Sequence, residues 1–252
     1  MDIQKFQDEI LNNQRNWQKK PILQKIYHGF HRTIATHLSN LSGPLVVELG
    51  SGIGNIKEII PDCLRTDLFL NPWIDQIENA YKLSFNSGTV SDLILFDVFH
   101  HLQYPGTALH EFNRVLRPGG RVIIFDPCMS LLGFFVFGLL HPEPVAWFDN
   151  ISWLAPLDWS VEKKEYYAAQ GNATRIFFGK ELTSLPDEWV VLYKHRFSAL
   201  AYIASGGYTK HQMYPDFFYS TLQLFERILD LFPTLFSTRL LVVLKKQINL
   251  EI

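Results

Sequence analysis

Residues 45–55 read Leu-Val-Val-Glu-Leu-Gly-Ser-Gly-Ile-Gly-Asn, and this stretch decides the fold. Its apolar first half predicts a short buried β-strand, and the three glycines predict a turn whose backbone can approach a ligand closely. Apolar residues within 56–60 predict a following helix that ends at Pro61. A ligand-binding turn at the edge of an α/β sheet has this order of elements.

The glycine spacing argues against a dinucleotide site. It is Gly-x-Gly-x-Gly, whereas dinucleotide-binding folds use Gly-x-Gly-x-x-Gly to seat a pyrophosphate on a helix N-terminus. Glu48, just before the turn, suits a ligand with a positive charge better than a pyrophosphate. Asp67 lies 19 residues beyond Glu48, where a carboxylate can accept both hydroxyls of a ribose. The plainer alternatives are a tight turn without a ligand and a helix-capping aspartate.

The rest of the chain alternates short apolar strands with helical segments, which indicates a mostly parallel sheet covered on both faces. After the strand at 45–49, strands are expected at 64–68, 76–78, 93–96, 121–125, 190–193 and 240–244. Helices are expected at 3–18 and 21–40, and again near 129–140 and 172–182. Residues 71–75 leave room only for a short connection between the second and third strands.

Bulk composition argues against several classes of function. A net charge of -2, with 19% charged residues over 252 positions, offers no basic footprint for a nucleic acid. The two cysteines, Cys63 and Cys128, lie outside metal-type spacing and are expected to be reduced. The N-terminus has no signal-peptide pattern, so a cytoplasmic location is expected. The nine histidines are scattered, and no metal site is predicted.

Residues 131–140, Leu-Leu-Gly-Phe-Phe-Val-Phe-Gly-Leu-Leu, are the longest apolar stretch. Ten residues are too few for a transmembrane span, which needs roughly twenty. The stretch is interpreted as a buried helix, with two alternatives: a wall of an apolar substrate pocket, or a surface that rests on lipid. Peripheral membrane contact therefore stays open.

Two further segments complete a recognisable set. Residues 91–102 read Ser-Asp-Leu-Ile-Leu-Phe-Asp-Val-Phe-His-His-Leu, and 111–121 contain Arg-Val-Leu-Arg-Pro-Gly-Gly. Together with the glycine-rich turn they resemble the class I S-adenosylmethionine-dependent methyltransferases of the small-molecule, quinone-biosynthesis kind. The resemblance covers residues 44–127. It implies a Rossmann-like, doubly wound α/β fold with seven strands, one of them antiparallel.

The resemblance also implies the cofactor, S-adenosylmethionine, with S-adenosylhomocysteine as product. A cofactor of this kind carries the positive charge that Glu48 suits. Asn79 stands where the family often has Asp, and its amide is expected at the adenine edge. The implied contacts are Glu48, Gly50, Ser51, Gly52 and Gly54 in the turn, Asp67 and Leu68 at the ribose, Asn79 and Ala80 at the adenine, and Phe96 and Asp97 beside the methionine.

The chain is expected to form one methyltransferase domain over residues 1–252. Within it we expect an N-terminal helical segment (1–42), a cofactor-binding core (43–127), an insertion (128–189) and the remaining strands (190–252). The insertion is rich in aromatic residues, which are expected to be core or a lid that excludes water. The last hundred residues match no family motif.

Methyl transfer to a hydroxyl requires removal of a proton, and a histidine or a carboxylate is the expected base. The catalytic candidates are His100, His101, Asp126 and His141, and Glu143 is considered together with His141 in the segment His-Pro-Glu-Pro at 141–144. Each has a structural alternative: a buried histidine, a strand end, or a rigid proline turn.

The predicted function is methylation, with oxygen the favoured atom, of a small apolar, aromatic, lipid-linked or sugar-linked metabolite. The principal alternative is a non-catalytic methyltransferase-like protein that binds S-adenosylmethionine or acts as a scaffold. A nicotinamide oxidoreductase is a third hypothesis, opposed by the glycine spacing. The acceptor and the oligomeric state are left open.

Overall fold

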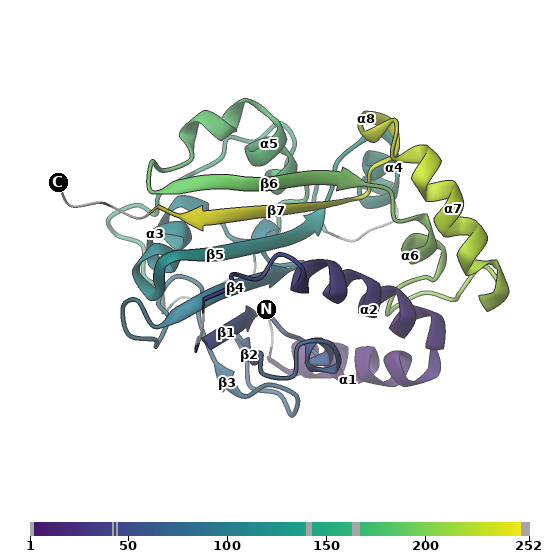
Figure 1. Ribbon diagram of the computed structural model, residues 1–252, viewed down its shortest axis with the longest axis horizontal. Helices are drawn as coiled ribbons and strands as arrows, with labels where there is room; N and C mark the ends of the chain where they lie inside the picture. The colour runs from purple at the N-terminus through teal and green to yellow at the C-terminus, as the bar shows by residue number, and fades with distance from the viewer. Residues whose placement is uncertain (1–2, 42, 44, 140–142, 163–166, 248–252) are drawn as a thin grey trace.

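The computed structural model describes residues 3–41, 43, 45–139, 143–162 and 167–247. They build a seven-stranded sheet in the order β3-β2-β1-β4-β5-β7-β6 (Figure 1). The strands are β1 Leu45–Leu49, β2 Leu64–Asp67, β3 Gln76–Ile77, β4 Val90–Phe96, β5 Leu116–Pro127, β6 Trp189–Phe197 and β7 Arg239–Lys246. Every expected strand is present, and the later ones are longer than their apolar centres indicated.

The sheet has one antiparallel member, as the resemblance implied. Strands β3, β2, β1, β4 and β5 pair in parallel, whereas β7 runs antiparallel to both β5 and β6. The carboxyl ends of β1, β2, β4 and β5 therefore lie at one edge. Parallel sheets of this kind bind their ligands beyond the carboxyl ends of the strands.

Two apolar clusters cover the two faces of the sheet. Ile94, Ile123 and Val243 pack with α1 (Ile3–Lys19) and α2 (Pro21–Ala35) on one face. Their neighbours along the strands pack on the other face with α3 (Pro105–Val115) and α5 (Asn172–Phe178). This alternation follows from the two-residue period of a strand. The free cysteines Cys63 and Cys128 are both buried.

Helix α2 ends at Ala35, five residues earlier than predicted. Asp92 in β4 accounts for the early end. Its two carboxylate oxygens accept hydrogen bonds from the Ser39 backbone nitrogen (2.8 Å) and from the Ser39 hydroxyl (2.7 Å). The chain after α2 is thus tied to the sheet, and a helix cannot continue through it.

The segment after the glycine-rich turn is a 3-10 helix, η1 (Asn55–Glu58), and not the expected helix to residue 60. Pro61 follows too closely for a longer helix to form. Ile56 anchors η1 because its side chain is completely buried. The connection from β2 to β3 is short and without a helix, as predicted.

The longest apolar stretch forms helix α4 (Leu131–Leu139), but the prediction that this helix is buried is wrong. Only Gly133 and Phe137 are buried, while Leu131, Phe135 and Leu139 are 70%, 56% and 71% exposed. Within the described ranges, no helix combines the length and the apolar character that crossing a membrane requires. The remaining helices are α6 (Leu200–Ala204), α7 (Tyr219–Leu229), α8 (Pro233–Phe236), and the 3-10 helices η2 (Phe99–His101), η3 (Lys180–Ser184) and η4 (Asp216–Phe218).

Candidate active site

The glycine-rich turn leaves β1 in a conformation that requires glycine. Gly50 and Gly54 have φ angles of 69° and 67°. A Cβ atom on Gly50 would lie 2.5 Å from Cγ2 of Val98, and one on Gly54 would lie 2.4 Å from the carbonyl oxygen of Trp73. The turn thus packs closely against the residues that follow β4 and β2, with no room for larger side chains.

Asp67 at the end of β2 holds this turn. Its carboxylate accepts hydrogen bonds from the backbone nitrogens of Gly52 (3.0 Å) and Leu68 (2.7 Å). Ser51 joins the same arrangement, because its nitrogen donates to the Thr66 carbonyl at 2.8 Å. Burial raises the pKa of Asp67, and the backbone donors oppose that shift. The structure therefore brings together the turn residues and the predicted ribose ligand.

Glu48 is the buried acid beside the turn. Glu48 is only 3% exposed, and its Oε2 has no hydrogen-bond partner among the described residues. Burial raises the pKa of Glu48 to about 7. A buried carboxylate oxygen without a partner is costly, and a cationic ligand group would stabilise it. Together with Asp67, Glu48 fits a ligand that carries both a positive charge and a ribose.

The other residues that the resemblance implies as cofactor contacts already contact other parts of the protein. The Asn79 amide is already engaged: its nitrogen donates to the Val161 carbonyl at 3.2 Å, and its oxygen accepts from Tyr81 at 3.0 Å. Ala80 packs against the apolar core. The Phe96 ring is stacked between Phe125 and Tyr27, with centroid distances of 4.8 and 5.3 Å.

Asp97, which follows β4, has a φ of 56°, a left-handed conformation that residues other than glycine seldom adopt. Its carboxylate forms an ion pair with the guanidinium of Arg239, which starts β7 and has a side chain only 2% exposed. The guanidinium also lies 4.6 Å from the ring centroid of Tyr202. Arg239 was not among the predicted site residues, although a cation at the entry of an apolar strand is a visible signal.

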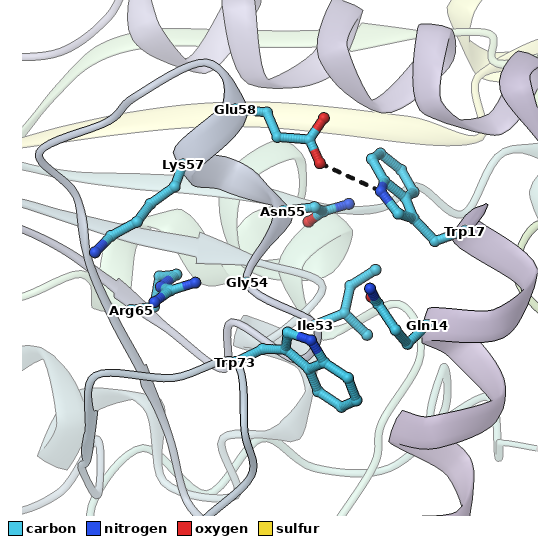
Figure 2. Close-up of a pocket in the computed structure, with 9 residues that line it drawn as sticks. All are labelled: Gln14, Trp17, Ile53, Gly54, Asn55, Lys57, Glu58, Arg65 and Trp73. Atoms are coloured by element: carbon cyan, nitrogen blue, oxygen red, sulfur yellow. Dashed lines mark hydrogen bonds between the residues drawn. The ribbon is translucent and has the colours of Figure 1, made fainter.

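A cleft of about 330 Å³ borders the turn on the side of α1 (Figure 2). It is lined by Gln14, Trp17, Ile53, Gly54, Asn55, Lys57, Glu58, Arg65 and Trp73. Trp17 reaches from α1 toward the turn and donates to Glu58 at 3.3 Å (Figure 2). Neither Glu48 nor Asp67 lines this cleft, so we do not assign the cofactor to it.

Four ionisable side chains meet at the carboxyl ends of β4 and β5, and we call His100, His101, Asp126 and Glu143 the polar cluster. Nδ1 of His100 lies 3.1 Å from Oδ2 of Asp126, which also accepts the His100 backbone nitrogen at 2.9 Å. Nε2 of His100 lies 3.4 Å from Oε2 of Glu143, and Nε2 of His101 lies 3.7 Å from Oε1 of Glu143. Three of the four predicted catalytic residues are thus neighbours.

The fourth predicted catalytic residue, His141, lies outside the described residues.

The pKa values of the two histidines in the polar cluster shift in opposite directions. Burial lowers the pKa of His100, but the carboxylates of Asp126 and Glu143 more than compensate and raise it to about 10. Burial and then the neighbouring His100 lower the pKa of His101. The cluster can therefore hold a positive charge at His100, between two carboxylates.

Comparisons with known proteins agree with this fold. A profile described as a methyltransferase domain matches residues 64–124. A search of curated proteins finds no match. A geranyl diphosphate methyltransferase solved in complex with S-adenosylmethionine is similar, with a TM-score of 0.50, 12% identity, and coverage of 87% of this chain and 85% of that chain.

A second similar chain comes from the complex between the Haloferax volcanii Trm112 methyltransferase activator and a methyltransferase. It has a TM-score of 0.52 at 13% identity and covers 96% of this chain and 98% of that chain. At such low identities the two structures establish the fold alone.

Proposed function

Because the chain is a class I S-adenosylmethionine-dependent methyltransferase, we propose that it methylates an oxygen of a small molecule whose hydroxyl is received by the polar cluster. The observation that most supports this proposal is that the polar cluster lies next to the residues that we assign to the cofactor. Asp97 precedes His100 by three residues, and its backbone nitrogen donates to the carbonyl of Phe125 at 2.8 Å, next to Asp126.

The residues on the cofactor side bind S-adenosylmethionine and orient it. S-adenosylmethionine supplies a methyl group on a positively charged sulfonium. Glu48 offers a buried carboxylate to a positive charge, and Asp67 offers oxygen acceptors to ribose hydroxyls. The glycine-rich turn brings backbone within reach of the ligand without side chains in the way.

On the acceptor side, a hydroxyl nucleophile must lose its proton as the carbon–oxygen bond forms and the carbon–sulfur bond breaks. The polar cluster supplies nitrogen and carboxylate acceptors for that purpose. Asp126 fixes the ring of His100 from behind, since it holds both Nδ1 and the backbone nitrogen. Positioning by such a pair contributes to rate in addition to proton removal.

The insertion at residues 128–189 supports a small, partly apolar acceptor. Trp159 packs edge-on against Tyr81 and Tyr104, with centroid distances of 5.0 and 5.3 Å. The Trp153 carbonyl accepts the Gly106 nitrogen at 2.8 Å. These contacts tie the insertion to Tyr81, which follows β3, and to the start of α3, where it can act as the lid that excludes water. The similarity to a geranyl diphosphate methyltransferase also favours a small-molecule acceptor.

A screen with radiolabelled S-adenosylmethionine and hydroxyl compounds of phenolic, sugar and isoprenoid type tests the proposal. With an acceptor found, Asp126→Asn should lower kcat by roughly 10²–10⁴-fold with little change in cofactor affinity. His110→Ala is the matched control, because His110 pairs with Glu188 at 2.8 Å outside the cluster. Unchanged turnover in both Asp126→Asn and His100→Gln would remove the cluster from the reaction.

A further inference from the structure

Three side chains of the polar cluster have the spacing of a metal site. One ligand atom each from His100, His101 and Glu143 can be chosen so that all three lie within 4.8 Å of one another. The two nitrogen-to-carboxylate distances are 3.4 and 3.7 Å. A tetrahedral ion with bonds of about 2.0–2.2 Å holds its ligands about 3.3–3.6 Å apart, so small side-chain rotations would seat an ion.

Each histidine is also oriented from behind as a metal ligand is. Nδ1 of His100 faces Asp126 at 3.1 Å, and Nδ1 of His101 lies 2.8 Å from the carbonyl oxygen of Tyr167. A carbonyl or carboxylate acceptor at Nδ1 requires a hydrogen there, which leaves the lone pair of a neutral ring on Nε2. Nε2 is the nitrogen that faces Glu143 in both residues. Metal-bound histidines are commonly held in this tautomer by such partners.

The carboxylate ligand is held too. Oε2 of Glu143 accepts a hydrogen bond of 2.5 Å from the amide of Gln170, a residue that is only 1% exposed. Charge is also balanced, because the carboxylates of Asp126 and Glu143 would neutralise a divalent ion. Two imidazoles and one carboxylate favour first-row transition ions over Ca²⁺ and Mg²⁺, which prefer oxygen ligands alone.

We propose that His100, His101 and Glu143 bind one divalent first-row transition-metal ion, with Asp126 and the Tyr167 carbonyl orienting the two histidines. The ion would join η2, which follows β4, to the insertion. One backbone bond already joins these segments, since Ala169 donates to the His100 carbonyl at 2.9 Å; within the insertion, Gln170 donates to the Pro144 carbonyl at 3.0 Å, next to Glu143.

Three protein ligands leave coordination positions for water or an acceptor oxygen. A metal-bound hydroxyl loses its proton more readily than a free one, which would give the ion a part in methyl transfer. That part rests on the proposed function, whereas metal binding itself does not. The competing arrangement is a protonated His100 held between two carboxylates with no metal.

Titration of chelator-treated protein with Co²⁺ and Zn²⁺ tests the proposal, by calorimetry and by the visible absorption of bound Co²⁺. We expect one ion per chain and a Co²⁺ spectrum typical of four or five ligands. Glu143→Gln and His101→Ala each remove one ligand from a partly exposed position, and each should weaken binding at least tenfold. Asp126→Asn should weaken it by roughly 10–100-fold.

His110→Ala is again the matched control, since it removes a histidine that pairs with a glutamate elsewhere, and it should leave affinity unchanged. Circular dichroism confirms that each variant is folded. Absence of stoichiometric binding to the unmodified chain would overturn the proposal, as would equal binding by Glu143→Gln and His101→Ala. Metal binding without any effect of the cluster variants on methyl transfer would instead contradict the proposed function alone.

Discussion

Arg239 and Asp97 form an ion pair that joins the start of β7 to the end of β4, at the edge where the residues proposed to bind the cofactor lie. The Arg239 side chain is 2% exposed, while that of Asp97 is 30% exposed and lies on a residue with a φ of 56°. Arg239 also faces the rings of Tyr202 and Phe125. A buried cation with one carboxylate partner depends strongly on that partner.

Asp97→Asn tests this dependence. Asparagine tolerates the left-handed backbone, so the substitution removes the charge without adding strain. The uncompensated Arg239 should lower the free energy of unfolding by about 3 kcal/mol, measured by urea denaturation. The double variant Asp97→Asn with Arg239→Met should recover part of that loss. Equal losses in the single and double variants would show that the pair is not the cause.

Glu48 predicts a pH dependence of stability. Burial raises its pKa from 4.5 to about 7, so the folded state binds this proton more tightly than the unfolded state. The protein without cofactor should therefore lose stability as pH rises from about 4.5 to about 7, by on the order of 3 kcal/mol. Denaturation at a series of pH values measures the loss, and Glu48→Gln should flatten it.

The control for that experiment is Glu226→Gln. Burial raises the pKa of Glu226 to about 7 as well, so its contribution must be subtracted. Cofactor affinity separates the two acids, because only Glu48 is assigned to the cofactor. Affinity for S-adenosylmethionine should increase as pH rises through about 7 in the unmodified chain and in Glu226→Gln, but not in Glu48→Gln. A pH-independent affinity in all three would remove Glu48 from the cofactor site.

Gly54→Ala tests the close packing of the turn. The new Cβ would lie 2.4 Å from the Trp73 carbonyl oxygen, so backbone must move, and S-adenosylmethionine affinity should fall at least tenfold. Gly88→Ala is the matched control: its φ is 68°, and nothing lies within 4 Å of the added atom. Gly88→Ala should cost only the backbone strain, about 1–2 kcal/mol. Similar affinities in both variants would contradict the assigned turn.

The alternation of apolar strands with helical segments, together with the motifs between residues 44 and 127, was enough to predict the architecture, because each of these signals is local in the sequence. The bounds of α2 were missed because its end depends on a hydrogen bond from Ser39 to Asp92, 53 positions away. The prediction that α4 is buried was wrong for a different reason: a hydrophobic sequence does not show whether another element packs against it.

The candidate site was only partly predictable for the same reason. Local motifs indicated His100, His101 and Asp126, since each follows a predicted strand. Arg239 was missed because its partner Asp97 lies 142 positions away and only the fold brings the two together. The convergence of Glu143 on the two histidines likewise follows from the path of the insertion, which no spacing in the sequence reveals.

The most direct test is calorimetric titration of the purified protein with S-adenosylmethionine, S-adenosylhomocysteine and NAD. We predict micromolar binding of the first two and none of NAD, with Asp67→Ala weakening both by at least tenfold. Binding of NAD, or no binding of either S-adenosyl compound, would contradict the account.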